Sequence, residues 1–246
     1  NGGTNGIVLN TTGAGGLIVS GDGGGSNNGS GGTIQSMTSD GVSLTSVANV
    51  RLNYMNITNN LGDGIGGGTI NGFQMNRTNI TGNGNDAASD ESGINVTQLT
   101  GTVIGGTNPT SMTNCTISNN NEFEVQITNT SGTLTDFQMS GNAISSNGLP
   151  INGNVSSPHG NLVNFLALGT ANMTTNVTSG TFTGNWNPVT PPSTITATAM
   201  QCDHSGTSGT MTANISNCTF TNNNVGPQAS VAGGAQMIFN FSNNIV

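Results

Sequence analysis

An internal repeat that ends in asparagine constrains this chain more than any other feature. Each of its seven copies is anchored on an apolar residue, and the anchors are Ile57, Ile80, Ile117, Ile144, Phe182, Phe220 and Phe241. A Ser or Thr follows each anchor, and an asparagine stands three positions after it: Asn60, Asn83, Asn120, Asn147, Asn185, Asn223 and Asn244. Five positions before the anchor, six copies are apolar and the last has Gln236. Anchors lie 21 to 38 residues apart, and a constant motif at such spacing is typical of solenoids.

The repeating unit is predicted to consist of strands. Apolar and polar side chains alternate in segments such as 50–54 and 137–140, at the two-residue period of a strand. The chain has 39 glycines, which would destabilise helices. A second series of strand-like segments precedes the anchors, at 41–44, 64–65, 93–96, 123–127, 162–166 and 195–200. Each coil is therefore expected to contain at least two strands and a sharp asparagine-bearing turn, with variable insertions between them.

Stacking of equivalent turns explains the asparagine. If successive coils pair in parallel about 4.8 Å apart, each Asn amide can donate to the side-chain carbonyl of the next. The buried polar groups then satisfy one another in a ladder. Asparagine also tolerates the left-handed backbone of a tight turn. The anchors are expected to stack inside as an aliphatic and then aromatic column. The alternative is that asparagine is only a surface turn residue in a chain rich in it.

Segments 39–44, 50–60 and 218–223 resemble right-handed parallel β-helices of the pectate-lyase-like superfamily. More narrowly, they are similar to the Gly/Asn/Thr-rich β-helical segments of large secreted bacterial surface proteins. The resemblance implies an all-β, right-handed parallel β-helix (β-solenoid) of about eight coils. We expect one domain over 1–246, with a less regular first coil at 1–31 and repeat coils at 32–246. Because this fold carries lyases, tailspikes, adhesins and passive spacers alike, it predicts no activity.

The charges exclude several partners. The chain has no Lys, and only Arg51 and Arg77 stand against ten acids, which gives a formal net charge of −8. Nucleic-acid binding needs clustered Lys or Arg, so neither nucleic acid nor an anionic membrane surface is an expected partner. No run of 18 apolar residues is present, so no membrane span is expected.

The sequence does not predict an enzyme. Relatives that resemble pectate lyases use clustered Asp for calcium with a basic residue, and those that resemble polygalacturonases use two or three Asp and a His. Here the acids are scattered, and Arg51 and Arg77 hold different positions in the repeat, so no catalytic residue carries over. Residues 203–205 (Asp-His-Ser) are interpreted as a loop, because adjacent residues cannot all converge on one bond.

No cofactor is expected. An oxygen-rich insertion with Asp86, Asp90 and Glu91 is either a calcium site or, as we favour, a solvated loop. The three cysteines, Cys115, Cys202 and Cys218, are too few for a disulfide scaffold and are expected to be buried. Whether Cys202 and Cys218 are bridged stays open at this point.

Both ends of the predicted solenoid are open. No amphipathic cap helix is visible, and strands are predicted at 6–9 and 236–241. Open complementary ends make a non-closing contact that generates filaments. The residues expected to assemble are Ile7, Val8, Leu9, Met237, Ile238, Phe239 and Phe241. The alternative is a stretch excised from a longer β-helix.

The expected function is therefore structural. We expect an extracellular or cell-surface protein that self-associates head to tail into a filament or surface fibre. An adhesin or glycan-binding stalk of a large surface protein, with cell-surface or glycan contacts, is the alternative. A polysaccharide lyase or hydrolase is the least favoured function.

Overall fold

The computed structural model describes residues 2–84, 91–101, 110–146, 161–184 and 198–246, and these contain strands and no helix. The strands fall into three series that follow one another along the chain. The first series is β1 (Ile7–Asn10), β4 (Val42–Thr45), the first part of β7 (Ile65–Asn76), β9 (Ile94–Thr100), β12 (Val125–Asn129), β15 (Val163–Gly169), β18 (Met200–Gly206) and β21 (Gln228–Gly233). The second is β2 (Leu17–Val19), β5 (Val47–Asn53), the rest of β7, β10 (Thr110–Thr113), β13 (Thr133–Ser140), β16 (Asn172–Thr178), β19 (Thr210–Ser216) and β22 (Gln236–Ser242). The third is β3 (Gly32–Gln35), β6 (Met55–Thr58), β8 (Asn79–Thr81), β11 (Thr116–Ser118), β14 (Ala143–Ser145), β17 (Thr181–Thr183) and β20 (Thr219–Thr221).

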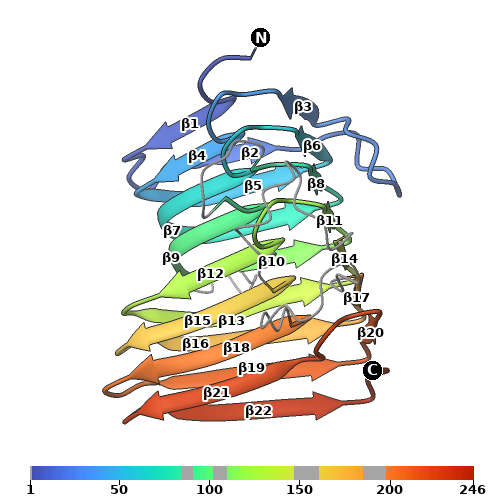
Figure 1. The fold of residues 1–246 in the computed structure, drawn as a ribbon. Coiled ribbons are helices and arrows are strands. Elements are labelled where there is room, and N and C mark those ends of the chain that lie inside the picture. Colours follow the sequence, from blue (N-terminus) through green and yellow to red (C-terminus); the bar gives the residue numbers. More distant parts are fainter. Residues whose placement is uncertain (1, 85–90, 102–109, 147–160, 185–197) are drawn as a thin grey trace.

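Within each series, every described strand pairs in parallel with its neighbours in the stack, and the first and last of them pair with another strand on one side only. The third series forms a seven-stranded sheet from β3 to β20. The first and second series are joined into one 15-stranded sheet, because the long strand β7 pairs with β9 through 65–71 and with β10 through 73–76. Figure 1 shows the strands stacked in layers from the N-terminal to the C-terminal end. The prediction of an all-β chain of parallel strands is confirmed. The arrangement is solenoid-like and compatible with a parallel β-helix.

The predicted strands at 41–44, 64–65, 93–96, 123–127 and 162–166 coincide with first-series strands. The sixth, at 195–200, does not, because β18 begins only at Met200 and 195–197 lie outside the described residues. The predicted segments 50–54 and 137–140 coincide with the second-series strands β5 and β13, but sequence analysis did not separate the second series from the third. Between β5 and β6 the bend is Tyr54 alone, which has a φ of 58°. Such a bend leaves no break in the apolar pattern.

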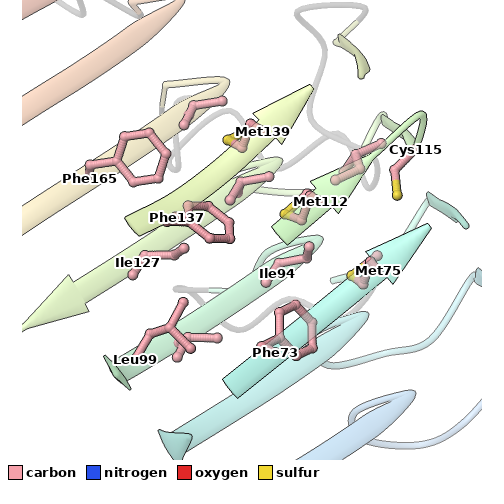
Figure 2. Close-up of a cluster of buried hydrophobic side chains, with 14 of the residues drawn as sticks. Phe73, Met75, Ile94, Leu99, Met112, Cys115, Ile127, Phe137, Met139 and Phe165 are labelled. Atoms are coloured by element: carbon pink, nitrogen blue, oxygen red, sulfur yellow. The ribbon is translucent and has the colours of Figure 1, made fainter. Parts of the chain in front are cut away.

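The core is one continuous column of side chains that point inward from all three series. In the middle of the stack, Phe73 and Met75 of β7, Met112 of β10, and Phe137 and Met139 of β13 face the same interior (Figure 2). These side chains are almost fully buried, and burial of each contributes about 1.5–3 kcal/mol. Stacked coils therefore bury a core that no single coil could enclose.

None of the described residues forms a helix that could span a membrane.

Candidate functional site

Six of the seven predicted anchors form one buried column. Ile57, Ile80, Ile117, Ile144, Phe182 and Phe220 are paired in this order through the third-series sheet. The rings of Phe182 and Phe220 are stacked, with centroids 4.8 Å apart and an interplanar angle of 12°. Sequence analysis missed the first member, Ile34, which pairs with Ile57. Ile34 escaped detection because Met37, rather than asparagine, stands three positions after it.

The seventh anchor was predicted wrongly. Phe241 pairs with Ile215, so it belongs to the column that stands five residues before the anchors. Ile245 pairs with Thr219 in an isolated bridge. The next residue, Val246, therefore lies opposite Phe220 and takes the place in the anchor column that was predicted for Phe241. Residues 241–244 (Phe-Ser-Asn-Asn) match the motif by composition alone. The polar Gln236 was the signal of the error, because it occupies a position that is apolar in the other six copies.

Asn60, Asn83 and Asn120 form a buried ladder. The Nδ2 of Asn60 donates to Oδ1 of Asn83 at 2.7 Å, and the Nδ2 of Asn83 donates to Oδ1 of Asn120 at 2.8 Å. The backbone N–H groups of Asn60 and Asn83 donate to the same two oxygens, and the Met37 N–H donates to Oδ1 of Asn60. Amides Asn83 and Asn120 also donate to the backbone carbonyls of Ile57 and Ile80. All these buried groups are thus satisfied, which avoids about 1–3 kcal/mol for each unpaired group.

A column of glycines makes room for this ladder. A Cβ added at Gly41, Gly64 or Gly93 would lie 2.6–2.9 Å from the Nδ2 atom of Asn60, Asn83 or Asn120 respectively. Each ladder amide therefore occupies space that any other residue would fill. The prediction that the ladder asparagines adopt the left-handed backbone of the turn is wrong. The residue before each of them does so instead: Asn59, Gly82 and Asn119 have φ of 54°, 69° and 56°.

Glu124 terminates the ladder. Glu124 occupies the next place after Gly93 in the column that holds Gly41, Gly64 and Gly93. Its buried carboxyl group accepts a hydrogen bond from Nδ2 of Asn120 at 2.5 Å and another from the Asn120 backbone N–H at 3.3 Å. Burial raises the pKa of Glu124 to about 8, although the hydrogen bonds from Asn120 act in the opposite direction. Sequence analysis missed this residue. The signal was its place directly before Val125, where the preceding strands have Gly before Ile or Val.

The other predicted ladder residues do not extend the run. Asn147 and Asn185 lie outside the described residues. Asn223 donates to the backbone carbonyl of Phe182 at 3.0 Å, and its Oδ1 has no partner. Asn244 accepts from the N–H of Cys218 and donates to the carbonyl of Ile215, which are turn contacts rather than ladder contacts. Placing Asn244 in the ladder was therefore wrong, for the same register reason as Phe241.

Two carboxyl groups that are 23 residues apart in the sequence meet in a cleft. The pairing of Val42 with Ile65 brings Asp40 beside Asp63, and the Asp63 N–H donates to Oδ1 of Asp40 at 3.2 Å. Burial raises the pKa of Asp63 to about 8, with smaller contributions from the charges of Asp40 and Glu122. The pKa of Asp40 is also raised by burial. Burial thus shifts the pKa of both carboxyl groups in the direction of the uncharged form.

The cleft itself is a trough of about 280 Å³ on the outer face of β7. Its lining includes Gly66, Gly67 and Gly68, flanked by Ser43 and Thr45 of β4 and by Asn95 and Thr97 of β9, with both aspartates close by. Hydroxyl, amide and carboxyl groups thus surround a stretch of bare backbone. Such a trough can offer hydrogen bonds to a polar ligand.

The candidate calcium loop lies largely outside the described residues. Asp86 and Asp90 lie outside the described residues, and within those residues no three His, Cys, Asp or Glu are grouped to hold a metal ion. The three cysteines are free and buried, so no bridge joins Cys202 to Cys218. Burial raises the thiol pKa of Cys115 and Cys202 to about 12, which leaves them unreactive.

The triad-like residues lie in a strand, not in a loop as predicted. Asp203, His204 and Ser205 belong to β18, where successive side chains point to opposite faces. His204 is buried, with Nε2 3.0 Å from the carbonyl oxygen of Ala171, whereas the hydroxyl of Ser205 is on the exposed face. The strand geometry therefore prevents a catalytic arrangement.

Exposed apolar side chains gather at the two ends of the stack. The large hydrophobic residues that are exposed by 40–75% are Val8, Ile18, Val231, Ile238, Phe241, Ile245 and Val246. They belong to β1, β2, β21, β22 and the residues after β22. Of the other predicted assembly residues, Ile7, Leu9, Met237 and Phe239 are half-buried against the core. Within the described residues these end strands pair on one side only, β1 with β4 and β22 with β19.

Comparisons with protein-family models, with curated proteins and with solved structures found no match to this chain.

Proposed function

We propose that this chain is a structural extracellular protein, a subunit of a filament or surface fibre. Its described strands then form a right-handed parallel β-helix of about eight coils, and subunits stack head to tail through its open ends. The observation that carries the proposal is the position of the exposed apolar residues. Among the described residues, the large ones belong to the strands at the two ends of the stack and to the residues after β22, where Val8, Ile18 and Ile238 face outward and the others line the open ends.

Edge strands with unpaired N–H and C=O groups are templates for further pairing, and soluble proteins protect them with charged residues. Here that protection is nearly missing from the sequence. Residues 204–246 contain no Asp, Glu, Lys or Arg, and residues 1–39 contain only Asp22. The two ends are different surfaces, so the contact between them is heterologous and does not close. Repeated contacts of this kind build a filament.

The extracellular location is part of the proposal. It rests on the Gly/Asn/Thr-rich sequence, which resembles that of secreted surface proteins. A non-enzymatic role is also proposed, since residues 203–205 cannot converge and Arg51 and Arg77 lie apart in the repeat.

Negative-stain electron microscopy of the purified protein tests this function. At about 4.8 Å per coil, each subunit adds about 40 Å to the axis, so uniform fibres with that axial repeat are expected. The variant Val246→Lys places a charge in the inward-facing anchor column at one end, and Ile18→Lys places the same charge on an end strand in an outward-facing column. Fibres should be lost only in the first. Isolated short rods of the unmodified protein at every concentration would refute the proposal.

A glycan-binding stalk is the second candidate, and the trough over Gly66–Gly68 is the observation that favours it. Sugars present hydroxyl groups that the carboxyl, amide and hydroxyl groups of the trough can bind. A glycan array tests this with the unmodified protein and with the variants Asp63→Asn and Gly66→Val, because a Cβ at Gly66 would lie 2.6 Å from Oδ2 of Asp40 in the trough. Binding that both substitutions abolish would support a stalk, and an array without signal would remove it. A lyase or hydrolase remains the least favoured function.

A further inference from the structure

We infer that the filament contact continues the stack in register, with a second copy of this chain as the partner. The strands β21 and β22 of one copy pair with β1 and β2 of the next, and the segment that contains Ile245 pairs with β3. This inference rests on the proposed head-to-tail assembly and adds its register.

The interior columns define that register. At one end, Leu17 and Val19 of β2 pair with Val50 and Leu52. At the other end, Phe239 and Phe241 of β22 pair with Ala213 and Ile215. The intervening strand pairings join Val50 to Ala213 in one column and Leu52 to Ile215 in another. Continuing both columns therefore sets Phe239 on Leu17 and Phe241 on Val19.

The first-series strands and the third-series segment give the same register independently. The column that begins at Leu9 and Leu44 ends at Ala229, so Ala229 meets Leu9. The column of Ile34 and Ile57 ends at Val246, so Val246 meets Ile34. Half-buried core residues at each end are thus covered by core residues of the partner.

The turn between the two copies also fits. The N–H of Thr38 donates to the carbonyl of Gly3, as the N–H of Leu61 donates to the carbonyl of Met37. Residues 2–6 therefore occupy the place of the turn that follows a third-series strand. In the paired arrangement, residues 2–6 of the second copy complete the turn that follows Ile245 and Val246 of the first.

A slip in register is strongly disfavoured. A shift by one residue would point Ile18 into the core and turn Leu17 and Val19 out to solvent. A shift by two residues would keep the inward pattern of one strand. Only short turns join β21 to β22 and β1 to β2, so a shift of one strand of each pair forces the other strand to shift in the same direction around the coil. The pairs Ala229–Leu9 and Val246–Ile34 would then both be lost.

Disulfide trapping tests the register. In the predicted contact, Asn240 and Ile18 lie opposite each other in an outward-facing column, with Cα atoms about 4.8 Å apart, within disulfide reach. The double variant Ile18→Cys/Asn240→Cys should form a ladder of covalent multimers on mild oxidation. The matched control Ile18→Cys/Ile238→Cys is displaced by two residues, with Cα atoms about 8 Å apart, beyond that reach. The native cysteines are buried and should not compete.

The outcomes separate the inference from the proposed function. Both variants are first imaged under reducing conditions, where each should form fibres. Fibres with cross-links only in the 18/240 variant support the register. Fibres with equal cross-linking in both variants, or with none in the 18/240 variant, overturn the register while leaving the filament intact. Loss of self-association in the unmodified protein overturns both.

Discussion

The buried carboxyl group of Glu124 makes the stability of this protein depend on pH in an unusual direction. An acid whose pKa is higher in the folded than in the unfolded state stabilises the fold below its unfolded pKa. That stability is lost as the pH rises to the folded pKa. For Glu124 burial raises the pKa from its ordinary value of 4.5 to about 8, so the loss extends from about pH 4.5 to about pH 8. At pH 7 it amounts to about 3 kcal/mol, since one pKa unit corresponds to about 1.4 kcal/mol.

The substitution Glu124→Gln removes this dependence. A glutamine retains an oxygen that accepts from Nδ2 of Asn120, but it cannot ionise, so burial no longer imposes a charge penalty. We expect the variant to be more stable than the unmodified protein by about 2–3 kcal/mol at pH 7. At pH 4, where Glu124 is protonated, the two proteins should differ by less than about 1 kcal/mol.

Urea unfolding at pH 4, 5, 6, 7 and 8 measures the effect, at a concentration below any assembly. Asp22→Asn is the matched control. Asp22 is exposed and its pKa is lowered by hydrogen bonds from the Gly24 backbone, Asn28 and Ser30. Its substitution should leave the pH slope between 5 and 8 unchanged. A Glu124→Gln protein that is no more stable than its parent at pH 7, or that keeps the parent's slope, would refute the reasoning.

Three further predictions concern the ladder, the glycine column and the ends. Asn83→Ala leaves the Asn60 and Asn120 side chains without their partner and should lower the free energy of unfolding by about 2–4 kcal/mol in thermal or urea unfolding. The control Asn223→Ala should lower it by less than about 1 kcal/mol, and equal losses of stability in the two variants would contradict the ladder. Gly93→Ala puts a Cβ 2.6 Å from the Asn120 amide and should cost about 1–3 kcal/mol, whereas Gly25→Ala meets no atom within 4 Å and should be neutral. Val246→Lys should lower self-association in sedimentation without changing the unfolding midpoint, and a lower midpoint would indicate a role in folding instead.

The repeat was sufficient to predict much of the fold. Strand character, parallel pairing and the buried column from Ile57 to Phe220 follow from a motif that recurs in register. The limit of this reasoning is its reliance on short motifs. Ile34 lacks the asparagine and was overlooked, whereas Phe241 has it in the wrong column. Composition can imitate a turn, but only the pairing of whole strands fixes which column a residue joins.

The clefts and caps were harder to predict because they depend on distant residues. Asp40 and Asp63 are scattered acids in the sequence and become neighbours only when β4 pairs with β7. Glu124 is one acid among ten until its register position after Gly93 is known. Sequence reasoning gives the period of a solenoid more readily than the exceptions to it, and the exceptions are where acidic side chains are buried.

The corner of the stack beside the anchors is built differently on the two sides of Glu124. Where the glycine column runs, from Gly41 to Gly93, the corner accepts asparagine amides. Beyond Glu124 the same register holds Leu162 and Ala199, and the anchors become Phe182 and Phe220. The glycine is thus replaced by a larger side chain where the anchors become aromatic, although the Asn223 amide still donates to the backbone carbonyl of Phe182, as the Asn83 amide does to that of Ile57. Glu124 lies at this change, where its carboxylate satisfies the last amide that has no asparagine acceptor among the described residues. Its retention in the core, despite the energetic cost, is explained by that single orphaned donor.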